Sequence, residues 1–202
     1  MTIIQQKSGL SGHGDLYLTM PLREVTRGSY LVAEPFITDP TFYRKVVIVL
    51  DKDEDGTVGL VINEPSDYII GEPDGDDALG LPIHDGGPVE PENSFQFLHN
   101  SPWIEGSQEL IPGLFWGGDM EAIVKGFTAG KLTKENLLCY RGYCGWAPGQ
   151  LEKEVESKSW IIAPPNPRYL FMPQARIWRS ILEDLGGPFS WLAKAPVSVD
   201  LN

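Results

Sequence analysis

Residues 142–152 read GYCGWAPGQLE, a run of glycines and aromatics around a proline that suits the first position of a helix. Backbone N–H groups at Gly149, Gln150 and Leu151 could receive a carboxylate or phosphate, which the Gln150 side chain would orient. The segment also has a structural explanation, in which Trp146 covers the core and the glycines permit a sharp turn from strand to helix. The candidates for binding a ligand or partner in this segment are Gly145, Trp146, Gln150 and Glu152.

A thiol in the same segment raises the possibility of catalysis. Cys144 precedes the expected helix, whose dipole can lower a thiol pKa, and His99 is an available base. The alternative is therefore an enzyme with a cleft near Trp146 and His99. Cys139 is better explained by core packing. The chain contains no Gly-x-Ser-x-Gly and no Gly-x-Gly-x-x-Gly after a strand, so the sequence names no catalytic residue and no cofactor.

An acidic run could be mistaken for a calcium site. Asp51, Asp53, Asp55 and Gly56 match the opening positions of an EF-hand loop, but Ile62 stands where that loop needs a bidentate glutamate. The flanking residues also have the composition of strands rather than helices. We predict an acidic hairpin turn. The histidines lack a recognisable ligand spacing, so no metal site is expected.

A second turn, HDGGPV at 84–89, contains two glycines that can adopt positive φ and expose backbone N–H groups to an anion. A tight turn between strands explains it equally well, and the Lys and Ser/Thr of a P-loop are missing. Gly86 and Gly87 join the candidates, with Asp39, Asn63 and His99. We expect Asp39, Asn63, Gly86 and Gly87 to converge with residues 146–152 in one cleft or face.

The overall charge disfavours nucleic acid as a direct partner. The 202 residues carry a net charge of −12, and the 16 basic residues are dispersed, whereas nucleic-acid binders usually have a basic patch or stripe. No long apolar run indicates a membrane span, and residues 1–14 lack the pattern of a signal peptide. We expect a cytoplasmic protein, with an unidentified protein or small molecule as its partner.

The elements that must position the candidates are short. Apolar runs predict core strands at 30–33, 46–50 and 57–63, with the acidic turn between the second and third. Further strands are predicted at 94–99, 114–117, 137–141, 159–163 and 169–171. Helices are predicted at 120–127, 148–156 and 174–185, with a one-turn piece at 189–193. Residues 66–82, rich in Pro, Gly and acidic side chains, predict an exposed loop.

Strands in blocks followed by mixed helices and strands favour an α+β protein. We predict an N-terminal arm at residues 1–27 and one domain at 28–202. No internal repeat or linker divides the chain further.

The chain resembles the YqgE/AlgH family over about residues 28–192. The residues that carry the resemblance, in family order, are Leu31-Val32-Ala33-Glu34-Pro35, Asp39-Pro40-x-Phe42, Gly56-x-x-Gly59-Leu60-Val61-Ile62-Asn63, Gly86-Gly87-Pro88-Val89, Leu98-His99, Gly142-Tyr143-x-Gly145-Trp146, Gly149-Gln150-Leu151-Glu152 and Trp160. Glu64 stands where the family has arginine, which removes any anion site built on that arginine. Cys144 stands where the family has alanine, which argues against an essential nucleophile.

The resemblance implies an α+β fold with a bifurcated, mostly antiparallel sheet curled into a pseudo-barrel, with a few short helices packed on it. It brings no established activity, although some members are labelled transcriptional regulators. We favour a non-enzymatic regulatory binding module that acts indirectly through a protein or small ligand. An enzyme and a direct DNA-binding regulator are the alternatives.

Overall fold

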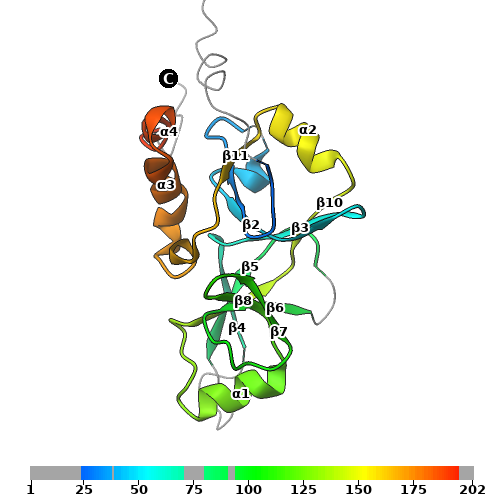
Figure 1. The fold of residues 1–202 in the computed structure, drawn as a ribbon. Helices are drawn as coiled ribbons and strands as arrows, with labels where there is room; N and C mark the ends of the chain where they lie inside the picture. Colours follow the sequence, from blue (N-terminus) through cyan, green and yellow to red (C-terminus); the bar gives the residue numbers. More distant parts are fainter. Residues whose placement is uncertain (1–23, 38, 71–79, 91–93, 196–202) are drawn as a thin grey trace, which may run out of the picture.

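The computed structural model describes residues 24–37, 39–70, 80–90 and 94–195, and its strands form two sheets (Figure 1). Sheet A has the order β10-β3-β2-β1-β11, and every neighbouring pair is antiparallel. Its strands are β1 (Tyr30–Ala33), β2 (Val46–Asp53), β3 (Gly56–Val61), β10 (Cys144–Trp146) and β11 (Trp160–Ala163). The edge strands β10 and β11 therefore come from the second half of the chain.

Sheet B has the order β4-β5-β9-β6-β8-β7, and only β5 and β9 run parallel. Its strands are β4 (Pro65–Ile70), β5 (Leu81–Asp85), β6 (Phe95–His99), β7 (Ser107–Ile111), β8 (Leu114–Gly117) and β9 (Leu137–Arg141). The two sheets curl but do not close into a barrel. The predicted α+β class with mostly antiparallel strands is confirmed.

Four helices are present in the described ranges: α1 (Met120–Thr128), α2 (Gln150–Glu156), α3 (Gln174–Leu185) and α4 (Gly187–Leu192). Two 3-10 turns, η1 (Pro40–Phe42) and η2 (Pro167–Tyr169), complete the set. In Figure 1, α2 lies beyond sheet A, α1 lies beyond sheet B, and α3 and α4 run along one side. The helices therefore cover the outer faces and one flank.

Three apolar clusters account for this arrangement. The first contains residues of both sheets and of α3, the second lies between sheet A and α2, and the third lies between sheet B and α1. Strand β2 illustrates how the sequence builds two of them. Val46, Ile48 and Leu50 belong to the first cluster, while Val47 and Val49 belong to the second. Its continuous apolar run is thus that of a strand buried on both faces.

Several predicted elements need correction. Residues 65–70, predicted mostly as loop, form β4, and β5 begins at Leu81. Residues 71–79 of the same prediction lie outside the described residues, as do residues 1–23 of the predicted arm. The predicted strand at 169–171 is instead the end of η2 followed by a turn, held by the Tyr169 hydroxyl, which donates to Asp184 Oδ2 at 2.5 Å. Strands β5, β7 and β10 were not predicted, and His84 and Asp85, predicted as part of a turn, are the end of β5.

Candidate functional site

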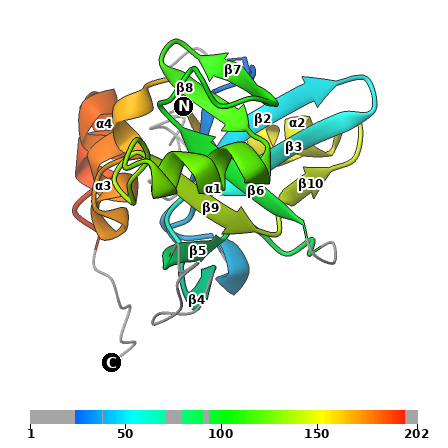
Figure 2. The ribbon, with the colours of Figure 1, turned by 90° about the horizontal axis from the view of Figure 1, so that it is seen from below.

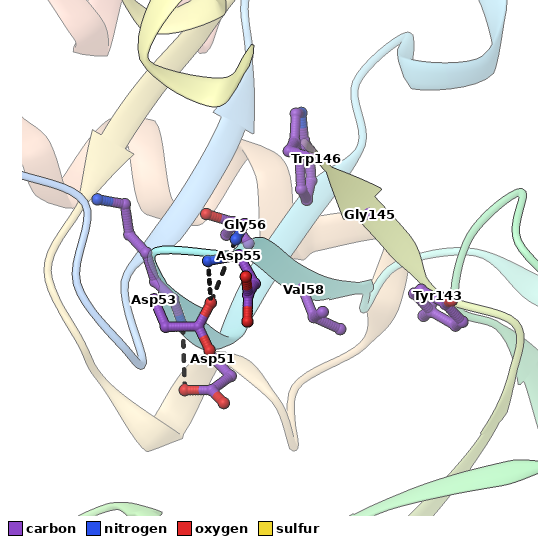
Figure 3. A pocket seen from close by; sticks show the side chains of 10 residues that line it. Asp51, Asp53, Asp55, Gly56, Val58, Tyr143, Gly145 and Trp146 are labelled. Atoms are coloured by element: carbon purple, nitrogen blue, oxygen red, sulfur yellow. Dashed lines mark hydrogen bonds between the residues drawn. The ribbon is translucent and has the colours of Figure 1, made fainter. Parts of the chain in front are cut away.

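A shallow pocket of about 390 Å³ lies where the β2–β3 hairpin meets β10 (Figure 3). Figure 3 shows acidic side chains at one end of the pocket and Tyr143 at the other, with Val58 and Gly145 between them. The lining residues are Asp51, Lys52, Asp53, Asp55, Gly56, Thr57, Val58, Tyr143, Gly145 and Trp146. Two candidates from the sequence, Gly145 and Trp146, are therefore part of it.

Strand pairing brings these distant segments together. β3 pairs with β2 on one side and with β10 on the other, so Val58 lies between Asp51 and Gly145. Thr57 pairs with Trp146 in the same ladder. The predicted acidic hairpin is present, and its turn is held by the Asp53 carboxylate, which accepts from the backbone N–H groups of Asp55 and Gly56 at 2.9 and 3.2 Å.

Behind the pocket, one carboxylate holds two tryptophans. Glu154 Oε2 accepts hydrogen bonds from the indole N–H groups of Trp146 and Trp160 at 2.9 and 2.8 Å. Its Oε1 accepts from Gln150 Nε2 at 3.0 Å. The two indole rings lie edge to face, 6.2 Å apart, and Trp146 is only 6% exposed. Trp146 is thus fixed in place and exposes little surface where it lines the pocket.

At the start of α2, one of the three backbone N–H groups predicted to receive an anion is already bonded within the turn. The helix begins at Gln150 rather than Pro148, and Gly149 before it is left-handed. The Gln150 backbone N–H donates to Ala147 O at 2.9 Å, while its side-chain Oε1 accepts from Ala147 N at 3.1 Å. Gln150 is exposed, but its hydrogen bonds close the turn that leads into the helix.

Glu152 lies beside the pocket rather than in it. Its carboxylate pairs with Lys52, with 3.1 Å between Oε1 and Nζ, and Lys52 lines the pocket. A hydrogen bond from its own backbone N–H and one from Lys52 lower the pKa of Glu152. The basic side chain of the pocket is therefore already paired with an acid.

Gly86 and Gly87 pack against the backbone of the segment just before β10. Gly86 N donates to Arg141 O at 2.7 Å, and its own carbonyl accepts from Val61 N at 2.8 Å. A Cβ on Gly87 would lie 2.4 Å from the Tyr143 carbonyl carbon, and Gly87 has a φ of +147°. The sequence region at 84–89 therefore joins the two sheets by close backbone contact, and it does not line the pocket.

Asn63 and Asp39 have local structural partners. Asn63 Oδ1 accepts from Val46 N and its Nδ2 donates to Arg44 O, both at 2.8 Å. Asn63 lies just past one end of β3, whereas the Thr57–Trp146 pair lies at the other end of this strand. Asp39 caps η1 by accepting from Thr41 N at 2.9 Å. The expected single cleft shared by all these candidates is not found in the pocket lining.

Cys144 and His99 do not form a nucleophile and base. Burial raises the pKa of the Cys144 thiol to about 12, and this side chain is only 2% exposed. His99 is fully buried in sheet B, stacked on Phe115. Its Nδ1 accepts from Ser101 N at 3.3 Å, so Nε2 carries the proton and donates to Gly117 O at 3.2 Å. Both imidazole nitrogens are thus occupied by backbone groups.

No group of three or more His, Cys, Asp and Glu side chains in the described part of the chain is arranged to hold a metal ion. None of the helices there is long and apolar enough to cross a membrane.

Sequence reasoning missed Glu154 and the pocket wall formed by Val58 and Tyr143. Glu154 lies four residues after Gln150, which is the spacing of neighbours on a helix face. That spacing could have predicted the contact between Gln150 and Glu154, but not the contacts of Glu154 with Trp146 and Trp160. The wall forms because β3 pairs with β10, whose residues are far apart in the chain. No local sequence pattern predicts such a pairing.

The comparisons with known proteins agree on the family. The AlgH-like family model (DUF179) matches residues 30–190. The UPF0301 protein CT0663 of Chlorobaculum tepidum is 32% identical over 177 residues, covering 87% of this chain and 95% of the relative. The UPF0301 protein BF2109 of Bacteroides fragilis is 32% identical over 180 residues, covering 88% and 91%.

Two solved structures share the fold. The solution structure of the AlgH protein from Pseudomonas aeruginosa has a TM-score of 0.65 and 27% identity, covering 87% of this chain and 99% of that one. The crystal structure of protein DIP2367 from Corynebacterium diphtheriae has a TM-score of 0.69 and 22% identity, covering 87% and 95%.

Proposed function

The chain belongs to the AlgH-like family, and we propose that it is a non-enzymatic regulatory binding module whose ligand or partner enters the pocket between the β2–β3 hairpin and β10. The observation that carries the proposal is Gly145, which lines this pocket and is exposed. A Cβ there would meet only Tyr143 Cε2, at an ordinary contact distance of 3.5 Å. Its φ lies outside the left-handed region. The backbone therefore has no need of glycine here, and its missing side chain keeps the pocket open.

The surroundings of the pocket suit recognition. Its back wall is fixed, because Trp146 is held by Glu154, and a fixed wall loses little conformational entropy when a ligand binds. Polar and apolar groups converge on it from two segments of the chain. A concave site with a few placed polar groups is typical of ligand binding.

The residues that suggested catalysis have structural roles instead. The Cys144 thiol is buried and protonated, and the His99 nitrogens are bonded to backbone. Neither lines the pocket. These contacts favour binding over a thiol-based reaction.

Regulation through a partner fits the charge better than direct contact with DNA. Arg176 and Arg179 are exposed on α3, but the whole chain carries −12. Such a charge opposes the neutralisation of phosphates on which DNA affinity depends. The regulatory role is therefore proposed to be indirect.

The test compares the wild-type chain with Gly145→Val, each immobilised and exposed to the same cell extract. Bound proteins and small molecules are identified by mass spectrometry. We expect at least one species to be captured by the wild type and lost from Gly145→Val, with both proteins equally folded by circular dichroism. Identical sets of captured species would contradict the proposal.

A further inference from the structure

The pocket is the uncovered end of a sheet face. Asp51, Val58 and Gly145 are register partners, so they point to the same side of sheet A. Val58 and Tyr143 pack at the border of the first apolar cluster, which lies between the two sheets. In Figures 1 and 2 the β2–β3 hairpin projects past sheet B. The pocket is therefore the part of the inter-sheet face that sheet B leaves open.

Negative charge gathers at the outer end of this face. Asp51, Asp53 and Asp55 line the pocket, and none of them forms an ion pair with a residue that the structure describes. Asp51 and Asp53 each use Oδ1 for backbone N–H groups of the hairpin. Lys52 is paired with Glu152. The net charge facing a ligand is thus negative.

The inner end of the face is apolar and aromatic. The Val58 side chain lies between the carboxylates and the Tyr143 ring (Figure 3), and Val58 and Tyr143 both pack against the first cluster. A surface that passes from apolar to acidic matches a Lys or Arg side chain, which has an aliphatic stem and a cationic head. An aromatic ring adds to the attraction of a cation.

The position of the pocket favours a polypeptide as the source of that cation. β10 is the edge strand of sheet A on this side; Tyr143 just before it pairs with Val89, and Gly145, two residues later, is the next residue along this edge. An edge strand can pair with an extended segment of another chain. Gly145 leaves room directly above this edge. A second copy of this chain is a poor occupant, because two molecules of charge −12 repel each other.

We propose that this pocket binds a Lys or Arg side chain from an extended segment of a partner protein. The aliphatic stem lies over Val58 and Tyr143, and the cationic head lies among the carboxylates of Asp51, Asp53 and Asp55. The inference rests on the proposed function, since it names the chemistry of the partner that the same pocket receives.

The experiment titrates the ¹⁵N-labelled full chain with the capped peptide Thr-Val-Arg-Val-Thr and follows amide chemical shifts. The matched peptide carries citrulline, which is neutral and nearly isosteric, in place of arginine. We expect saturable shifts at Val58, Gly145 and the hairpin residues, with affinity for the citrulline peptide weaker by about tenfold or more. The affinity for the arginine peptide should also fall as the salt concentration rises.

Two variants test the contacts. Gly145→Val fills the pocket, and Asp51→Asn/Asp55→Asn removes two charges while Asp53 continues to hold the turn. Each is expected to weaken the arginine peptide by about tenfold or more. The control Asp67→Asn/Glu156→Gln makes the same charge change at exposed positions outside the pocket and is expected to leave affinity unchanged.

The inference is overturned if the citrulline peptide binds as tightly as the arginine peptide, or if Asp51→Asn/Asp55→Asn keeps the wild-type affinity for the arginine peptide. It is also overturned if the control variant loses as much affinity as Asp51→Asn/Asp55→Asn. A fourth contrary result is that spermidine binds at this site more tightly than the arginine peptide. If a neutral or anionic species is captured in a Gly145-dependent way while the arginine peptide does not bind, the inference fails and the proposed function stands. If Gly145→Val changes nothing that is captured from extract, the proposed function itself fails.

Discussion

Among single residues, Glu154 combines the most contacts around the candidate site. Its two oxygens accept from two indoles and one amide, and it connects β10, α2 and β11. A half-buried carboxylate with three N–H donors needs no cation to remain in place. The geometry of Trp146 in the pocket therefore depends on a residue that does not line it.

Glu154→Ala is expected to lower the free energy of unfolding by about 2–4 kcal/mol, because it leaves two largely buried indole N–H groups without acceptors. The measurement is urea unfolding followed by tryptophan fluorescence. The control is Glu156→Ala, two residues further on α2 and exposed, which should cost less than about 0.5 kcal/mol. Equal effects of the two substitutions would show that the indole contacts contribute nothing.

Both cysteines are expected to be unreactive in the folded protein. Burial raises the pKa of Cys139 and of Cys144 to about 12, so both remain thiols at pH 7–9. Alkylation by iodoacetamide at pH 8 should be at least about 100-fold slower than in urea. Rapid modification of Cys144 in the native state would contradict this expectation and make Cys144 a candidate nucleophile again.

Acid should weaken the fold through the buried imidazole of His99 and the half-buried imidazole of His84. Burial lowers the pKa of His99 and of His84 below the ordinary value of 6.5, against smaller opposing effects of hydrogen bonds and of Asp85. As the pH falls through 6.5, these two histidines bind protons in the unfolded chain but remain largely neutral in the folded chain. Stability is therefore present above pH 6.5 and is lost below it, by at most about 1.4 kcal/mol per pH unit for each histidine.

Urea unfolding at pH 7.5, 6.5 and 5.5 measures this loss, and NMR of the His99 imidazole assigns part of it. The Hε1 shift of His99 should titrate with a midpoint below pH 6.5. A midpoint at or above 6.5 would contradict the lowered pKa.

At the scale of elements, Gly87 and Gly145 have opposite effects on the fold. Gly87→Ala places a Cβ 2.4 Å from the Tyr143 backbone at a φ of +147°, and should cost about 2–4 kcal/mol or prevent folding. Gly145→Ala meets no backbone atom and should stabilise β10 by about 0.5–1 kcal/mol. Thermal unfolding of both variants checks the pair. A destabilised Gly145→Ala would mean that the fold, rather than a ligand, requires this glycine.

The sequence predicted those elements whose own residues carry the signal. β1 and β2 contain runs of β-branched side chains, and α1 has a capping aspartate with apolar residues at helical spacing, so the first residue of each was found and the last to within three residues. β10 is three residues long with an exposed glycine at its centre, and β4 is an exposed edge strand that begins with proline. These two exist because neighbouring strands offer hydrogen bonds, which no local pattern reveals.

The same division applies to the candidate site. Gly145 and Trp146 were identified from their unusual neighbours, and the acidic hairpin was recognised as a turn. Their meeting in one pocket was not foreseen, because it depends on the pairing of Val58 with Gly145, which lie far apart in the sequence. Asn63 and Gln150 were predicted as binding candidates, and the structure adds that both bond backbone groups, which no local pattern indicated.

At the scale of the whole molecule, charge decides which partners can approach. We expect no sequence-specific DNA binding at physiological salt, since a net charge of −12 opposes counterion release from DNA. Fluorescence anisotropy with labelled promoter fragments is the measurement, with a scrambled fragment of equal length as the control. Salt-dependent, sub-micromolar binding of one fragment alone would restore the DNA-binding alternative.

The order of the strands in sheet A has a consequence for synthesis of the protein. β1, β2 and β3 are complete once residue 61 has been synthesised. Their flanking strands β10 and β11 begin only at residues 144 and 160. For more than a third of translation, a ribbon of buried apolar side chains therefore has both edges bare, and bare edges pair with whatever strand they meet. A message cut short between these points would yield an aggregating chain, so the nascent protein should depend on chaperones until its last third emerges.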